Sequence, residues 1–219
     1  MKMLVVFEKG ERLRHIGHLD LMRTMQRALR RSELPLQFSQ GFNPHILLTF
    51  AAPLSVGMPG KREVMEVPLS AQTSAAEFIQ KLNLSLPPDI VCLSAKPVDD
   101  RHPAPMSLLR AASYQFDFHG TSALFDAIPA FMAQEKIPAV RKTKTGDKPC
   151  DLRPMIYELK AEKELMEATL ALCESATCKP DLLLDALAEF AQVDKPRALV
   201  TRTHLFGDWN GELVPLENL

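Results

Sequence analysis

Residues 12–50 read RLRHIGHLDLMRTMQRALRRSELPLQFSQGFNPHILLTF, and the rest of the chain is organised around this stretch. It joins a His-Ile-Gly-His-Leu-Asp turn to a helix over about residues 18–32, which is followed by a Gly-Phe-Asn-Pro-His loop and an apolar run. At about 100° per residue, the apolar side chains of this helix gather on one side and four arginines gather on the other. The buried face carries Leu21, Met22, Met25, Ala28 and Leu29, and the exposed face carries Arg23, Arg27, Arg30 and Arg31.

The segments around this helix predict the order βαββαβ for the first part of the chain. Thr73 or Ser74 can cap a second helix, which must end before Pro87. This order is the split βαβ pattern of a ferredoxin-like fold, so the fold class we expect is α+β. Apolar or alternating runs predict strands over residues 3–8, 46–51, 63–69 and 90–95.

A similar but looser order follows residues 97–107, which hold three prolines. We expect a helix that is capped by Thr121 and kinked at Pro129. The prediction is two ferredoxin-like halves with antiparallel sheets, the second one elaborated: a domain over 1–96, a linker over 97–110 and a domain over 111–219. The second half has expected strands over residues 114–118, 137–144 and 197–206, a hairpin of residues 155–162 with 165–173, and a helix over 181–192.

Composition excludes several classes of protein. Hydrophobic residues make up 46% of the chain and charged residues 24%, which is typical of a soluble globular protein. The net charge of −1 means that a nucleic-acid-binding role needs a local patch. The four cysteines form no Cys-x-x-Cys pair, so we expect reduced thiols, no cofactor and no metal. With no signal peptide and no apolar run of about 20 residues, we expect a cytoplasmic protein with no membrane partner.

The arginine face of the helix is the first candidate binding site. Charged faces are common on surface helices, but such faces usually mix lysine with glutamate and aspartate. Here the type is arginine throughout, and Asp20 is the only carboxylate near the face. Guanidinium groups match phosphate oxygens, so the face predicts contacts with phosphate. Arg12 and Arg14 lie just before the helix in the sequence and are candidates for the same contacts.

A second basic segment follows residue 140 on an expected hairpin. It either keeps an exposed edge strand soluble or forms a second phosphate-contacting finger. Aromatic residues are only 6% of the chain, so the composition favours recognition of RNA backbone and shape over base stacking. The cations of this segment are Arg141, Lys142, Lys144, Lys148 and Arg153.

Three histidines leave an enzymatic alternative open. His15, His18 and His45 are candidate catalytic residues, either as the acid and base of an RNA-processing enzyme or in a metal-assisted hydrolase. The plainer interpretation is that His18 is a core or capping residue, since no Glu or Cys at metal-ligand spacing accompanies His15 and His18. The loop after the helix is a further candidate site, formed by Gln40, Gly41, Phe42, Asn43 and His45.

Five segments of the chain carry a specific resemblance. They are RHIGHLD (14–20), MRTMQRALRR (22–31), SQGFNPH (39–45), AAPLSVG (51–57) and DLRP (151–154). In these the chain resembles the radical-SAM-linked protein family, a domain of unknown function found beside or fused to radical SAM proteins. The resemblance implies a radical SAM protein as partner, but the chain has no CxxxCxxC motif and hence no radical chemistry of its own.

The leading hypothesis is therefore a non-catalytic RNA-binding or adaptor protein that presents structured RNA, such as tRNA or rRNA, to a radical SAM partner. One alternative is the histidine enzyme described above. The other is a pure protein-binding partner, in which the arginine face docks on an acidic surface of the radical SAM protein.

Overall fold

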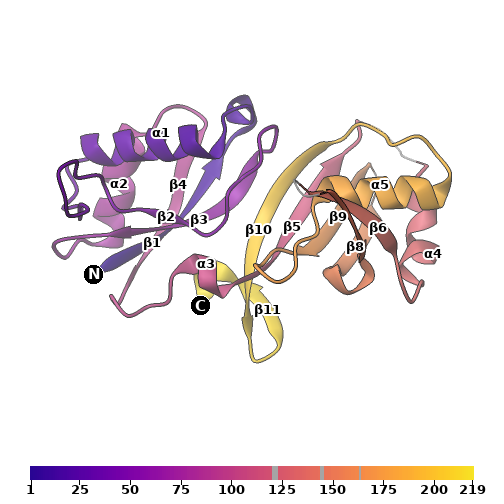
Figure 1. The fold of residues 1–219 in the computed structure, drawn as a ribbon. Coiled ribbons are helices and arrows are strands. Elements are labelled where there is room, and N and C mark those ends of the chain that lie inside the picture. The colour runs from indigo at the N-terminus through magenta and orange to yellow at the C-terminus, as the bar shows by residue number, and fades with distance from the viewer. Residues whose placement is uncertain (120–122, 144–145, 163) are drawn as a thin grey trace. The chain divides into compact units, whose positions relative to one another are not determined.

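The computed structural model describes residues 1–119, 123–143, 146–162 and 164–219, and it shows an α+β fold (Figure 1). The strands pair in a large, mostly antiparallel sheet and in a small two-stranded sheet. The chain divides into two compact units, residues 1–109 with 203–219 and residues 110–202. No helix in the described ranges is long and apolar enough to cross a bilayer.

The first unit is built around β1, which pairs antiparallel with β3 on one side and with β4 on the other. The short strand β2 pairs with β3. Met3, Val5 and Phe7 of β1 share one apolar core with side chains of both α1 and α2, so the two helices cover the same face of the strands. The elements are β1 (Lys2–Lys9), α1 (His18–Arg31), β2 (Thr49–Phe50), β3 (Gly60–Pro68), α2 (Ala75–Ser85), β4 (Ile90–Val98) and α3 (Pro105–Leu108), with β10 (Leu199–Trp209) and β11 (Glu212–Pro215) near the C-terminus.

The predicted first helix and its burial pattern are confirmed. Leu21, Met25 and Leu29 of α1 are buried in the core, while all four arginines are exposed. The second helix begins after Ser74, whose Oγ accepts a hydrogen bond from the backbone N–H of Glu77 at 3.2 Å. Of the two caps that the sequence left open, Thr73 and Ser74, the helix uses Ser74.

Two expectations for the first unit need correction. The strand predicted over residues 46–51 is reduced to β2, because Phe38 forms an isolated bridge with Ile46 and only Thr49 and Phe50 pair with β3. The proline-rich segment is also more regular than predicted. There β4 continues to Val98, and α3 occupies part of the expected linker.

The second unit has the strand order β5-β9-β8, with antiparallel pairs throughout. The predicted hairpin of residues 155–162 with 165–173 is confirmed as β8 and β9, and β6 and β7 form the separate two-stranded sheet. The elements are β5 (Leu109–Asp117), α4 (Ile128–Met132), β6 (Pro138–Thr143), β7 (Gly146–Asp151), β8 (Ile156–Glu162), β9 (Leu165–Ala171) and α5 (Pro180–Ala191).

The helix predicted from Thr121 onward is shorter than expected. It consists of a 3₁₀ turn over Phe125–Ala127 and of α4, and its predicted cap at Thr121 lies outside the described residues. Pro129 does not kink a helix, because it stands in the first turn of α4, where a missing N–H costs no hydrogen bond.

The turn that leads into α1 is held by a buried charge at the end of β1. Lys9 is only 1% exposed, and its Nζ donates to the carbonyl oxygens of Arg14 at 3.3 Å, Ile16 at 3.1 Å and Met58 at 3.4 Å. Three carbonyls thus surround an ammonium that carries three donors. The same contact joins the turn before α1 to the turn before β3.

We expect Lys9→Met to lower the free energy of unfolding by about 3 kcal/mol, because a side chain of similar length would bury three carbonyls without the charged donor. Urea unfolding of the variant measures this change. Lys96→Met is the control, since Lys96 is exposed on β4 and its replacement should change stability by less than about 0.5 kcal/mol. Equal stability of the two variants would show that the Lys9 contacts contribute nothing net.

Candidate functional site

The four arginines of α1 differ in what their guanidinium groups contact. Arg31 donates from Nη2 to the carbonyl oxygen of Ser85 at 2.6 Å, so it ties α1 to the end of α2. Arg23 forms an exposed ion pair with Asp20 at 3.3 Å, one turn earlier on the helix. Arg27 and Arg30 are exposed, and neither makes a hydrogen bond or an ion pair within the described ranges.

Arg27 and Arg30 are neighbours on the helix surface, because residues three apart stack on one face. Like charges at this spacing destabilise a helix slightly when no anion lies between them. The surrounding stretch offers little compensation, since residues 12–50 contain six arginines and two carboxylates. The two guanidinium groups therefore form a cationic site whose balancing negative charge has to come from solvent or from a ligand.

The loop over residues 39–45 lies beside this pair, and both of its ends are fixed by the same two residues. The Ser39 N–H donates to the carbonyl of His45 at 2.9 Å, and the His45 N–H donates to Ser39 Oγ at 3.1 Å. The Ser39 hydroxyl also bonds Nδ1 of the His45 ring at 2.8 Å. We call residues 39–45 the pinned loop. Gly41 adopts φ +129° inside it, a conformation that side chains disfavour.

Helix α1 and the pinned loop enclose a shallow hollow of about 250 Å³, which we call the arginine hollow. Gln26 fixes one wall against the other, because its Nε2 donates to the carbonyl of Ile46 at 3.4 Å. The hollow is smaller than the usual 300–1,000 Å³ of a pocket for a whole small molecule, so it suits a single group such as a phosphate. It is lined by Arg23, Gln26, Arg27, Arg30, His45 and Ile46.

Phe42 stands at the tip of the pinned loop and was underestimated from sequence. Its side chain is as exposed as in an extended chain, with a relative accessibility of 105%. The other candidate loop residues, Gln40, Gly41 and Asn43, are exposed as well. The low aromatic content argued against base stacking, but composition does not report where a given ring lies. The structure puts one bare aromatic ring three residues from a side chain that lines the arginine hollow.

The three candidate histidines occupy different positions. His15 is exposed before α1, and His18, the first residue of α1, packs edge-to-face on Phe50 with ring centroids 5.4 Å apart. His18 Nδ1 is buried and has no hydrogen-bond partner among the described residues. His45 lines the same hollow as Gln26. Gln26 is eight residues after His18 on α1, which places it about 12 Å away along the helix axis. No described hydrogen bond joins any two of these histidines.

The two upstream arginines contact nearby carboxylates. Arg12 lies 3.8 Å from Asp89, and Arg14 Nη1 lies 3.0 Å from Glu11 Oε1. The side chain of Arg12 is almost fully exposed, so its long contact leaves the guanidinium accessible to solvent. Neither residue lines the arginine hollow.

In the second unit, the two arginines of the basic segment already form hydrogen bonds within the protein, which its sequence did not indicate. Arg141 donates to the carbonyl of Thr177 at 2.6 Å, and Arg153 donates to the carbonyls of Met132 and Ile156. Lys142 stands opposite Asp147 in the β6–β7 ladder. Lys148 is exposed, and Lys144 lies outside the described residues. Both arginines therefore serve packing contacts within the unit.

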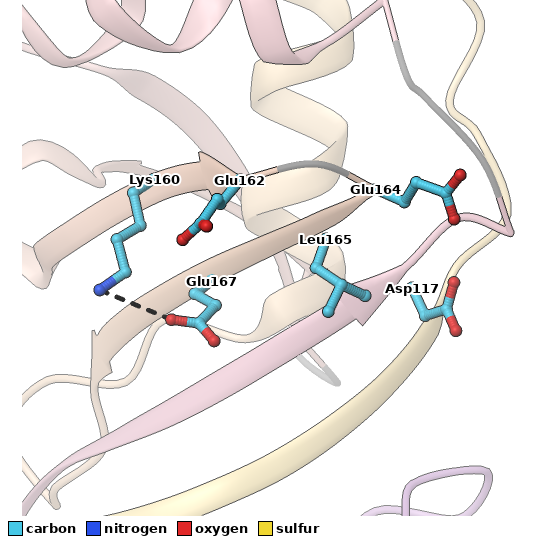
Figure 2. A pocket seen from close by; sticks show the side chains of 6 residues that line it. All are labelled: Asp117, Lys160, Glu162, Glu164, Leu165 and Glu167. Carbon is cyan, nitrogen blue, oxygen red and sulfur yellow. Dashed lines mark ion pairs between the residues drawn. The ribbon is translucent and has the colours of Figure 1, made fainter.

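Two larger hollows belong to the second unit. The first is acidic, and the second is lined by Arg141, Lys142 and Lys179 as well as by carboxylates. The first, of about 590 Å³, is lined mainly by carboxylates (Figure 2), which repel an anion. Among its described lining residues the cation is Lys160, which is already paired with Glu158 and Glu167. The second hollow, of about 410 Å³, contains carboxylates that Lys195 bridges. The residues that line the first are Asp117, Lys160, Glu162, Glu164, Leu165 and Glu167, and those that line the second are Val140, Arg141, Lys142, Thr177, Lys179, Asp181, Leu182 and Asp185.

The four cysteines, all within the described ranges, form no disulfide, and the surroundings of Cys92, Cys173 and Cys178 change the thiol pKa in different ways. All four are free, and burial raises the pKa of the Cys92 and Cys178 thiols to about 12. Burial is the largest single effect on the pKa of Cys173 and raises it, but the hydrogen bonds with Ser175 and Ala176 and the charge of Arg110 together lower that pKa below its ordinary value. Across the described ranges, no group of three or more His, Cys, Asp or Glu side chains is placed to hold a metal ion.

Ser39→Ala should loosen the pinned loop, because it removes the hydroxyl that bonds both the backbone and the ring of His45. Loss of about 1 kcal/mol of local stability corresponds to roughly fivefold faster hydrogen exchange at the His45 amide, measurable by NMR. Ser70→Ala, which removes a bond to the carbonyl of Pro35, should leave that exchange rate unchanged. An unchanged rate in Ser39→Ala would mean that the hydroxyl does not fix the loop.

Comparison with known families gives one result. A family model described as "Uncharacterized protein conserved in bacteria (DUF2344)" matches residues 2–180. The match includes α1, the pinned loop and the basic segment of the second unit, and its description names neither an activity nor a radical SAM protein. No curated protein matches the chain.

Proposed function

This chain belongs to the DUF2344 family, and we propose that it is a non-catalytic RNA-binding or adaptor protein that acts on structured RNA, such as tRNA or rRNA, with a radical SAM partner. The observation that carries the proposal is the arginine hollow, where Arg27 and Arg30 face solvent without a described partner. The partner is proposed from the sequence resemblance of residues 14–57.

The chemistry of the hollow favours a phosphate over other anions. Two guanidinium forks on one helix face can each give paired N–H donors to phosphate oxygens. Arg23 adds a third, because its exposed pair with Asp20 is weak and exchangeable. A phosphodiester chain supplies such groups at regular spacing, and each contact releases counterions from the nucleic acid.

The local character of the charge supports a specific RNA surface. The chain as a whole has a net charge of −1, so a global field does not attract nucleic acid. The acidic hollow of about 590 Å³ in the second unit repels a phosphate chain, whereas the arginine hollow in the first unit attracts one. Recognition of this kind follows backbone and shape, as is usual for folded RNA.

The element order of the first unit supports its assignment as a ferredoxin-like half. Its elements follow the order β1-α1-β2-β3-α2-β4, with β1 between β3 and β4 and β2 paired to β3. We propose that the second unit derives from the same plan, with the β6–β7 hairpin as an elaboration. In such a fold the helix face opposite the sheet is available for binding.

Charge reversal of the hollow tests the proposed function. Arg27→Glu with Arg30→Glu should abolish binding of a purified tRNA mixture, measured by fluorescence anisotropy at about 50 and about 200 mM salt. The milder Arg27→Ala with Arg30→Ala should reduce the slope of log K against log salt by about 1.4 to 1.8, the value for two lost phosphate contacts. Circular dichroism should show an unchanged fold.

The matched control is Lys96→Glu with Arg101→Glu. It changes the net charge equally at two exposed cations of the first unit that lie outside the hollow. Binding by wild type that is absent or insensitive to salt would contradict the proposal, as would equal loss in the control. Capture of a radical SAM protein that survives nuclease but is lost on Arg27/Arg30 reversal, without tRNA binding, would instead indicate a protein-docking surface.

A further inference from the structure

We propose that Phe42 is a stacking platform for an unpaired base of the bound RNA, and that the phosphate next to this base lies in the arginine hollow. This inference rests on the proposed function and deepens it, because it replaces recognition by backbone and shape alone with a requirement for a single-stranded segment. Three observations carry it: the exposure of the ring, the fixed ends of its loop and its distance from the cations.

The exposure of Phe42 is unusual for its surroundings. The ring contacts no core, and its neighbours in the loop are Gln40, Gly41, Asn43 and Pro44. A docking surface for a protein normally presents a contiguous apolar patch, whereas Phe42 is flanked by the polar side chains of Gln40 and Asn43, by a glycine and by one proline. A flat aromatic face with open space on both sides matches a nucleobase, which stacks on it whatever its identity.

The two ends of the pinned loop are fixed before any ligand binds. The hydrogen bonds between Ser39 and His45 close the loop, and the Phe38–Ile46 bridge fixes the chain just outside it. Ile46 is in turn anchored to α1 through Gln26. Since the ends of the loop are already fixed, ordering its backbone on binding costs less conformational entropy.

The distance between ring and cations fits adjacent parts of one strand. Phe42 is three residues from His45, which lines the arginine hollow, so their Cα atoms are at most about 10 Å apart. Successive nucleotides of a stacked strand rise by about 3.4 Å, so one to three nucleotides span this gap. A base on Phe42 and a phosphate on Arg27 and Arg30 can then belong to one short segment.

A membrane surface is the main rival occupant, since an aromatic ring beside cations also suits an anionic lipid interface. Interfacial binding, however, grows with the apolar area that is buried, and the pinned loop offers a single ring. Its frame also positions the cations in a hollow rather than along a flat polar face. These features favour the nucleotide.

Two RNA probes test the inference: a hairpin with an unpaired loop, and a fully paired duplex with the same number of phosphates. Phe42→Ala should weaken binding of the hairpin by about 5- to 150-fold, the range for loss of one base–aromatic stack. It should change binding of the duplex by less than about twofold and leave the salt slope unchanged. Phe42→Tyr should retain binding, because the ring is kept.

Fluorescence reports the contact directly. The chain has one tryptophan, Trp209, so Phe42→Trp in a Trp209→Phe background carries a single reporter on the pinned loop. We expect its emission to be quenched by the hairpin and little changed by the duplex. The wild-type protein, which reports from Trp209 alone, is the control and should show no quenching that distinguishes the two probes.

The outcomes separate this inference from the proposed function. If Phe42→Ala binds the hairpin like wild type while Arg27/Arg30 reversal abolishes binding, the stacking role is wrong and the RNA-binding function stands. Equal weakening for hairpin and duplex would also overturn stacking. Wild type that binds neither RNA overturns both, and Phe42-dependent binding to vesicles of anionic phospholipid in that case would identify a membrane surface instead.

Discussion

The first unit depends on the buried ammonium group of Lys9. Lys9 ends β1, where the chain must leave the sheet, and its ammonium gathers carbonyls from the turn before α1 and from the turn before β3. Burial of a charged group is costly unless it is hydrogen-bonded, so this position favours one arrangement of both turns. Gly60 stands opposite Lys9 in the ladder because a Cβ there would lie 2.6 Å from the Glu63 carboxylate.

From this anchor the geometry of the candidate site follows in steps. The fixed turn sets where α1 begins, and the apolar stripe of α1 sets its rotation about its own axis. Rotation in turn decides that Arg27 and Arg30 point away from the core. Gln26 then joins the middle of α1 to Ile46, so the pinned loop is placed against the same face. The hollow is thus the product of core packing.

The sequence predicted what is periodic and missed what is long-range. The helical period located α1, its buried stripe and its arginines, and the capping rule left Thr73 or Ser74 as the cap of α2. The helical period did not show that Arg31, unlike Arg27 and Arg30, is hydrogen-bonded within the described part of the chain, because the Ser85 carbonyl that it contacts lies 54 residues away. The hydrogen bonds of Arg141 and Arg153 were missed for the same reason, since the carbonyls of Thr177 and Met132 are distant in sequence. The grouping of residues 203–219 with the first unit likewise has no local signal.

The exposed ring of Phe42 and the charges of Arg27 and Arg30, unpaired among the described residues, are both unfavourable for the stability of the free protein. In each case the free protein keeps a group where a more stable sequence would cover it, pair it or replace it, and both features lie on one frame. An ordinary solvated face needs neither a fixed loop nor an arginine-only composition. Their coincidence, with the reciprocal bonds of Ser39 and His45 beside them, is what a site prepared for a ligand with both an aromatic and an anionic part requires.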